Sequence, residues 1–247
     1  MDYDATQKEV MYAEYAKSYD VDRRIAVGEP LLKERAQFLV SKLVNRSYVL
    51  DLGCGTGMVL EHICAKNPQG LTVGIDISAP MLEQAKAKLG ASNRVLLVKH
   101  DISRGLPFLD NYFDYIVASN VFQEVPDQRA LLSETIRILK VQGFFAAMMV
   151  CLENTTPANI AYSRIAEGYC WYFKIFSNMK QMVYESGLKI IVEEQRFAKN
   201  PMASLVEKEN KMQFSGFNTI MKRIAQEGAR PEQVSQGHYK FIAQKAR

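Results

Sequence analysis

The sequence predicts an α/β fold: a mostly parallel sheet of seven strands with helices on both faces. Short apolar segments alternate along the chain with segments of helical periodicity. The apolar segments are continuous rather than interrupted at every second residue, which is typical of strands that are buried on both faces. The connections are short, so that little room remains for another topology.

The first 45 residues are expected to form an N-terminal helical cap. Three tyrosines, Tyr12, Tyr15 and Tyr19, recur at helical spacing. The segment 31–44 follows with mostly apolar residues at the same period.

Residues 46–153 are expected to form the core, in which strands and helices alternate. The strands are expected at 48–52, 71–77, 94–102, 113–119 and 143–150. The helices are expected at 58–66, 79–89 and 128–140. Ser78 and Asp127 precede the last two helices and are suited to cap them.

The alternation changes after residue 153. Residues 154–176 are rich in aromatic residues but show no clear strand, and residues 197–236 mix polar and apolar residues around a helix expected at about 203–225. We interpret both segments as insertions that form a substrate lid. A helix and a strand are expected between them, and 237–246 should be the final strand. The chain 1–247 is therefore expected to be a single domain.

Composition narrows the classes of function. The chain has 31 basic and 27 acidic residues, and its net charge of +4 is too small to argue for nucleic acid. Its four cysteines show no CxxC spacing, which predicts reduced thiols and no metal site. Neither a signal-peptide layout nor an apolar run of roughly 18 residues is seen, so we expect a cytoplasmic protein without a membrane span. The oligomeric state cannot be predicted.

Three glycines follow the first strand in the run DLGCGTG: Gly53, Gly55 and Gly57. Glycine can adopt backbone angles closed to other residues and leaves no side chain between a turn and its ligand. Such a turn often holds a nucleotide, although a tight turn without a ligand is the alternative. A dinucleotide site would need GxGxxG, and here Met58 stands at the third glycine. An NAD-dependent enzyme is therefore disfavoured.

Two acids follow at the ends of the next strands. Asp76 ends the second strand and could accept hydrogen bonds from both hydroxyls of a ribose. Asp101 ends the third strand and could bind the exocyclic amine of an adenine. Either acid alone could be an ordinary surface residue, but with the glycine turn they give three ligand groups along the edge of one sheet.

Several runs together resemble a known family. DLGCGTG, GIDIS, HDI, FDYIVASNVFQEVPD and ILKVQG are similar to the motifs of class I S-adenosylmethionine-dependent methyltransferases. The likeness is greatest to the small-molecule branch that includes ubiquinone and menaquinone biosynthesis enzymes. It covers roughly residues 45–150, and YAKSYD near the N-terminus is similar to the YxxxYD run of that branch. The resemblance implies a Rossmann-like fold, S-adenosyl-L-methionine as cofactor and S-adenosyl-L-homocysteine as product.

The resemblance also implies a cofactor site along the strand ends. Around the methionine part it would place Asp51, Gly53, Gly55 and Gly57. Around the ribose and the adenine it would place Asp76, Ile77, Asp101 and Ile102. Beside the sulfonium it would place Ser119 and Asn120, and Tyr19 would close over the cofactor.

The chain departs from the family pattern just after the fourth strand. Many relatives carry a histidine in an LxHVxD-like run, whereas this chain reads FQEVPD with Glu124 at that position. Glu124 is therefore the candidate catalytic base, needed only if the nucleophile still carries its proton. It could instead bind a cationic substrate, or be a carboxylate at the start of a helix.

The implied reaction is in-line methyl transfer to oxygen or nitrogen of a small, planar or partly apolar metabolite. Four aromatic residues of the insertions could contact it, unless they are ordinary core: Trp171, Tyr172, Phe214 and Phe217. The alternatives are a nucleic-acid or protein methyltransferase and a cofactor-binding regulatory protein without catalysis. The sequence does not identify the substrate or the acceptor atom.

Overall fold

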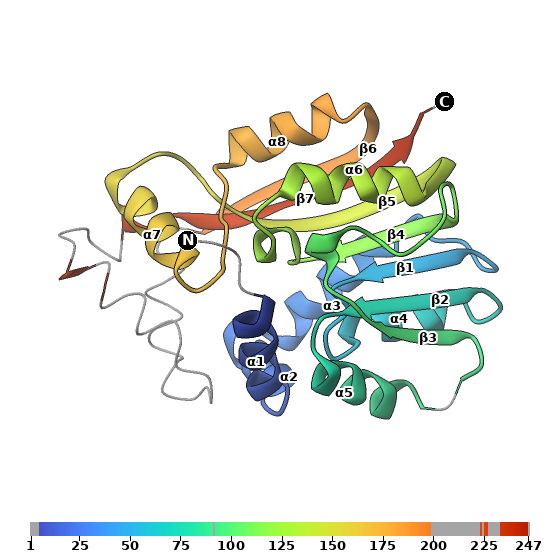
Figure 1. Cartoon of the computed structure of the whole chain (residues 1–247). Coiled ribbons are helices and arrows are strands. Elements are labelled where there is room, and N and C mark those ends of the chain that lie inside the picture. Colours follow the sequence, from blue (N-terminus) through green and yellow to red (C-terminus); the bar gives the residue numbers. More distant parts are fainter. Residues whose placement is uncertain (1–4, 91, 199–222, 224, 227–232, 247) are drawn as a thin grey trace.

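The computed structural model describes residues 5–90, 92–198, 223, 225–226 and 233–246. Seven strands form one sheet in the order β3-β2-β1-β4-β5-β7-β6 (Figure 1). They are β1 (Tyr48–Leu52), β2 (Leu71–Asp76), β3 (Val95–Lys99), β4 (Phe113–Ser119), β5 (Leu139–Leu152), β6 (Leu188–Ala198) and β7 (Gln236–Lys245). Only β7 runs antiparallel to its neighbours. The predicted mostly parallel, seven-stranded α/β fold is confirmed.

Helices cover both faces of this sheet (Figure 1). One face carries α3 (Glu29–Leu39), α4 (Met58–Lys66) and α5 (Ala79–Leu89), and the other carries α6 (Gln128–Ile138) and α8 (Phe176–Glu185). Both predicted helix caps are confirmed, because Ser78 accepts a hydrogen bond from the backbone N–H of Met81 and Asp127 accepts one from Ala130.

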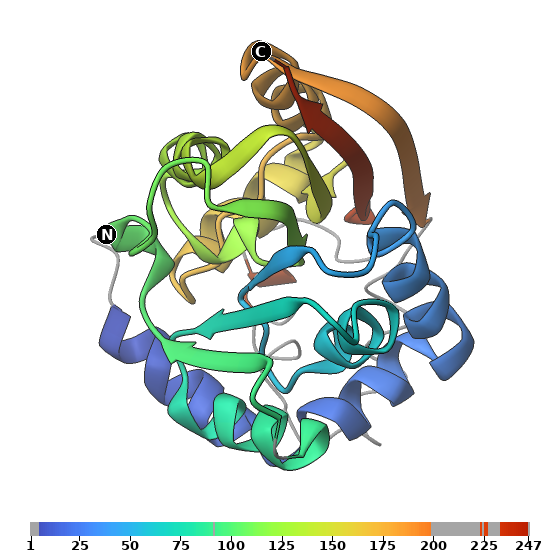
Figure 2. The same cartoon turned by 90° about the vertical axis from the view of Figure 1, so that its right-hand side faces the viewer.

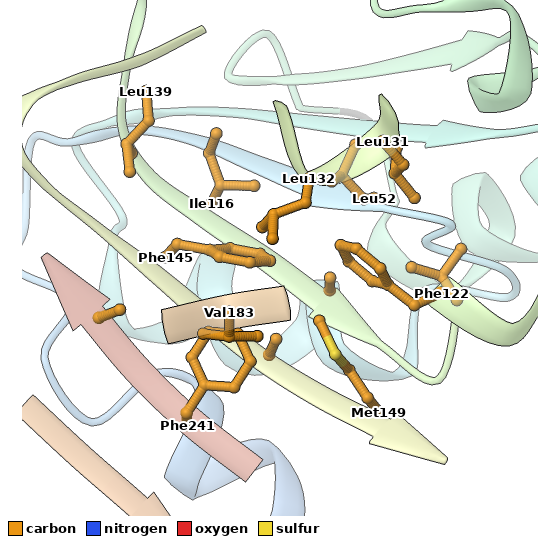
Figure 3. Packing of buried hydrophobic residues seen from close by; sticks show 14 of the residues in the cluster. Leu52, Ile116, Phe122, Leu131, Leu132, Leu139, Phe145, Met149, Val183 and Phe241 are labelled. Carbon is orange, nitrogen blue, oxygen red and sulfur yellow. The ribbon is translucent and has the colours of Figure 1, made fainter. Parts of the chain in front are cut away.

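The larger core lies between the sheet and the pair α6 and α8 (Figure 3). Phe145 of β5 and Phe241 of β7 meet edge to face with ring centroids 5.4 Å apart. Leu132 of α6 and Val183 of α8 pack around them. On the opposite face a second core joins α3 and α4 to the sheet through Leu39 and similar apolar residues. These two layers fix where the strand ends lie.

The N-terminal helices lie across the carboxyl ends of the parallel strands (Figures 1 and 2). They are α1 (Ala5–Tyr15) and α2 (Tyr19–Val27). Tyr15 and Ala16 pack on Met81 of α5, while Tyr15 and Tyr19 meet edge to face. The edge of the sheet where parallel strands place their ligand groups is therefore partly covered.

The segment 154–176, which was expected to be a lid insertion without a clear strand, contains α7 (Pro157–Glu167). Thr156 caps it by accepting a hydrogen bond from Asn159, and Pro157 begins its first turn. With residues on either side, α7 forms a small apolar core of its own that includes Tyr162, Trp171 and Val234. The capping threonine followed by a proline is a helix-start signal that the sequence contains, and the sequence reasoning missed it.

Two further differences concern element boundaries. Strand β5 begins at Leu139, not at residue 143, and α6 ends one residue before it. The pairing of β4 with β5 is irregular between Phe113 and Tyr115, and Gln142 adopts a positive φ of 67°. The helix expected at about 203–225 lies almost wholly outside the described residues. Among the described helices, none is both long and apolar enough to cross a membrane.

Candidate active site

The turn after β1 contains three glycines in the left-handed backbone conformation, and they serve different purposes. A Cβ on Gly53 (φ +64°) would lie 2.4 Å from Val121, and one on Gly57 (φ +81°) would lie 3.1 Å from the Cβ of Ala85. These two glycines allow close packing within the protein. A Cβ on Gly55 (φ +53°) would meet no atom within 4 Å. Of the three, only Gly55 therefore keeps space open beside the turn.

Asp76 ties the turn to the end of β2. Its Oδ2 accepts a hydrogen bond from the backbone N–H of Gly55 at 2.9 Å, and its Oδ1 accepts one from Ser78 at 2.9 Å. A carboxylate offers about four lone-pair sites, so roughly two remain for a ligand. Burial raises the pKa of Asp76 to about 6, although these two hydrogen bonds counteract the rise.

A first cavity, of about 620 Å³ including space open to solvent, lies at this edge of the sheet. It brings together ten of the residues expected at the site. They are Tyr19, Gly53, Gly55, Asp76, Ile77, Asp101, Ile102, Ser119, Asn120 and Glu124. Its lining thus follows the carboxyl ends of four adjacent strands.

A second cavity, of about 1040 Å³ including space open to solvent, lies beside the first. The two share five lining residues: Tyr19, Gly53, Gly55, Ser119 and Asn120. Asp51, expected at the site, lines the second cavity only. Gly57 lines neither of them.

Two buried oxygens at the cavities lack a hydrogen-bond donor among the described residues. They are Oδ2 of Asp51 and Oδ1 of Asn120. Burial, together with the nearby charge of Asp76, raises the pKa of Asp51 well above its usual value. Asn120 is held at a positive φ of 54°, and its N–H donates to the carbonyl of Met148 at 2.7 Å. Because buried acceptors are nearly always satisfied, these oxygens suit a ligand that carries donors or positive charge.

Comparison with known proteins finds a sequence family that is similar to part of the chain. A sequence profile described as a methyltransferase domain matches residues 49–143, which run from β1 into β5. This match to a methyltransferase domain covers less than half of the chain. A demethylmenaquinone methyltransferase of Staphylococcus aureus is 39% identical over 126 residues, covering 51% of this chain and 49% of that protein. The chain therefore spans about half the length of the curated relatives it matches.

Solved structures show the same fold at low sequence identity. A phosphoethanolamine N-methyltransferase 2 of Haemonchus contortus, in complex with S-adenosyl-L-methionine, superposes with a TM-score of 0.69 at 16% identity, covering 96% of this chain and 60% of that one. A geranyl diphosphate C-methyltransferase of Streptomyces coelicolor gives 0.68 at 15% identity, covering 92% and 84%. The cyclase SpnF gives 0.67 at 19% identity, covering 89% and 81%. The methyltransferase fold thus also occurs in a protein named as a cyclase.

Sequence reasoning missed Lys8, which lines the first cavity. Its side chain is 2% exposed, and its Nζ donates to Oε2 of Glu124 and to the carbonyl of Cys170, both at 2.5 Å. The hydroxyl of Tyr12 also hydrogen-bonds Glu124, and burial together with that carboxylate raises the pKa of Tyr12 well above its usual value. Lys8 stands four residues before Tyr12, on the same face of α1, and this spacing was the available signal.

Glu124 is the last residue of the short 3₁₀ helix η2 (Phe122–Glu124). The following helix α6 begins four residues later and is capped by Asp127 instead. Besides Lys8 and Tyr12, the side chain of Gln123 donates to Glu124 Oε1 at 3.1 Å. The Glu124 carboxylate therefore joins α1 to the loop after β4, which differs from the expectation of a carboxylate at a helix start.

Of the four aromatic residues expected at the substrate, the two that the structure describes line neither cavity. Trp171 lies in the small core around α7 and is 8% exposed. The backbone N–H of Tyr172 donates to the carbonyl of Gln123 at 2.7 Å, which fixes the loop beside Glu124. Phe214 and Phe217 lie outside the described residues.

Proposed function

We propose that the protein transfers a methyl group from S-adenosyl-L-methionine to oxygen or nitrogen of a small metabolite. The observation that supports this proposal most is the pair of buried acceptor oxygens, Asp51 Oδ2 and Asn120 Oδ1, beside the open space at Gly55. The cofactor has an ammonium group and a sulfonium, and both suit acceptors that lack a donor. The methyltransferase profile over residues 49–143 supports the same assignment.

The remaining expected residues fit the other parts of this cofactor. Asp76 has capacity left for two ribose hydroxyls. Asp101 and Ile102 would bind the adenine edge, and Ile77 would pack on its ring. Tyr19 lines both cavities, so that it could close over the cofactor from α2.

The bound cofactor supplies an activated methyl group, and the chain has to position the acceptor in line with it. Good alignment is worth up to about 7–11 kcal/mol in model reactions. Ser119 and Asn120 lie where the two cavities meet, and we assign the methyl group to this boundary. Glu124 already receives three donors, so we expect alignment to contribute more than proton removal by this carboxylate.

The substrate is expected to enter over the cofactor, between the N-terminal helices and the lid insertions. The name of the Staphylococcus aureus relative, a demethylmenaquinone methyltransferase, supports a planar and partly apolar acceptor. A cofactor-binding protein with another role is the second candidate, because the cyclase SpnF shares the fold. Labelled methyl transfer to a panel of small metabolites separates the two candidates, since only a methyltransferase labels an acceptor.

Cofactor affinity should depend on pH through Asp76. Ribose hydroxyls that donate to its carboxylate favour the charged form and lower its pKa on binding. Because the pKa in the free protein is about 6, affinity should be constant above that pH and weaken below it as protons compete. The limit is about tenfold per pH unit for one group. Calorimetric titration of S-adenosyl-L-homocysteine across this range measures the effect.

The control for this pH dependence is Asp76→Asn, which cannot titrate. Its affinity for S-adenosyl-L-homocysteine should be lower than that of the wild type at every pH, and should change less below pH 6. An affinity in the wild type that stays unchanged from neutral pH down to well below 6 would contradict the assignment of Asp76 to the ribose.

A further inference from the structure

One lysine is buried in the wall of the first cavity. Among the described residues that line this cavity, Lys8 is the only lysine or arginine, whereas Asp76, Asp101 and Glu124 supply three carboxylates. Asp76 and Asp101 belong to the ribose and adenine end of the proposed cofactor site. Lys8 pairs with the third carboxylate, so its ammonium lies at the part of the cavity that α1 and the loop after β4 form.

Hydrogen bonds connect this ion pair to the boundary of the two cavities. Nε2 of Gln123 donates to Oε1 of Glu124 at 3.1 Å and to the carbonyl of Asn120 at 2.5 Å. Asn120 belongs to the boundary to which we assign the methyl group, and it lines the first cavity together with Lys8. The ammonium of Lys8 and the residues beside the methyl group therefore face one shared space.

The ammonium of Lys8 has hydrogen-bonding capacity left for a ligand. It has three N–H donors, and described residues accept two of them, namely the carboxylate of Glu124 and the carbonyl of Cys170. The carboxylate is shared, because the side chains of Tyr12 and Gln123 also donate to it. Its negative charge is therefore divided among three donors, and one N–H of Lys8 remains for an oxygen in the cavity.

Lys8 also lies where the methyl acceptor is expected to enter. Cys170, whose carbonyl accepts a hydrogen bond from Lys8, belongs to the insertion 154–176. Met11, also on α1, packs against the small core around α7 of that insertion. Lys8 thus joins the N-terminal helices to the lid insertion, and an acceptor that enters between them passes its ammonium.

We propose that Lys8 binds the reacting oxygen of the methyl acceptor and holds it as an anion, so that the acceptor is an acidic hydroxyl such as a phenol or an enol. This inference rests on the proposed function and narrows its acceptor atom to oxygen. The hydroxyl gives up its proton to solvent on binding, so the reaction needs no base from Glu124.

The methyl transfer that follows is balanced in charge. A lone pair of the anionic oxygen forms the bond to the methyl carbon, and the carbon–sulfur bond breaks with its electron pair going to sulfur. The anion and the sulfonium thus become two neutral groups. An amine acceptor is disfavoured at this position, because its nitrogen becomes positive during the transfer, beside a buried ammonium.

The ionisation of bound para-nitrophenol tests the proposal, because only the anion of this phenol absorbs strongly in the visible range. In the wild type saturated with S-adenosyl-L-homocysteine, the midpoint of its ionisation should lie about 1–3 pH units lower than in water, the effect of one nearby opposite charge. The double variant Lys8→Met with Glu124→Gln removes both charges and should abolish the shift. Lys8→Arg keeps the positive charge and should retain most of it. Lys99→Met, which removes a largely exposed lysine paired with Glu9 of the same helix, is the matched control and should leave the shift unchanged.

Three results would overturn this role of Lys8. The first is a wild type that does not bind para-nitrophenol, or that binds it without lowering the midpoint, and this measurement needs no variant. The second is a shift that persists in the folded double variant, which would assign it to another group. The third is transfer of labelled methyl groups to amines but not to hydroxyl compounds.

Failure of the proposed function gives a different result. A wild type that lowers the midpoint but labels no acceptor would keep Lys8 as a binding site for an acidic hydroxyl in a protein that is not a methyltransferase. The midpoint is also measured without S-adenosyl-L-homocysteine, so that loss of binding of this product would defeat the proposed function alone.

Discussion

The Gly55→Val variant is expected to fold and to lose measurable binding of S-adenosyl-L-methionine and S-adenosyl-L-homocysteine. A side chain at Gly55 would meet no protein atom within 4 Å, and Gly55 lines both cavities. The added isopropyl group would therefore occupy the space that the proposed cofactor needs. Gly55 also has a φ of +53°, and the left-handed conformation costs a branched residue about 1–2 kcal/mol. Calorimetry with a melting curve measures both consequences.

Gly187→Val is the matched control for the backbone cost. Gly187 lies in the turn between α8 and β6, with a φ of +79° and open space around its Cβ position. Both variants should lose similar stability, and only Gly55→Val should lose cofactor affinity. A Gly55→Val protein that binds as tightly as the wild type would make the glycines part of a turn that holds no ligand.

Glu124→Gln is expected to lower the free energy of unfolding by about 3 kcal/mol or more. The variant leaves the ammonium of Lys8 almost fully buried without its charged partner, and breaking a buried ion pair costs about 3–5 kcal/mol. Adding Lys8→Met to Glu124→Gln removes both charges and should recover most of the stability. Urea unfolding of the two single variants and the double variant gives the coupling between the residues.

A second ion pair on the same helix provides the control. Glu9 of α1 pairs with Lys99 at 2.6 Å, but both side chains are largely exposed. Lys99→Met should therefore cost less than about 1 kcal/mol. Similar losses for Glu124→Gln and Lys99→Met would show that Glu124 does not hold α1 in place.

The double variant also tests whether Glu124 is a base. Its stability should be close to that of the wild type, so any kinetic defect reflects chemistry or substrate binding. Removal of a general base lowers kcat by about 10²–10⁴-fold. A near-normal kcat would leave alignment as the main contribution, and a raised KM with normal kcat would mean that Glu124 binds the substrate.

The parts of the site that could be predicted are those that short, continuous segments of the sequence determine. The glycine turn, Asp76 and the Ser119–Asn120 pair each follow a strand directly, so the order of a parallel sheet brings them to one edge. Gly57 was expected beside the ligand but packs on Ala85, because the motif does not say on which side of the turn a glycine makes room.

Lys8 and Arg35 could not be predicted in the same way. Their positions depend on how α1 and α3 pack against distant parts of the chain, namely Glu124 after β4 and His238 on β7. A lysine or arginine on a helix is usually at the surface, so the burial of these two side chains was not expected. The structure supplies the contact that holds α1 beside the first cavity.

Titration of S-adenosyl-L-homocysteine into the wild-type protein, with NAD as comparison, tests the central claim most directly. The geometry of Gly55, Asp76 and Asp51 predicts one S-adenosyl-L-homocysteine bound per chain and no binding of NAD. A folded protein that binds NAD, or that gives no heat with S-adenosyl-L-homocysteine, would contradict the account.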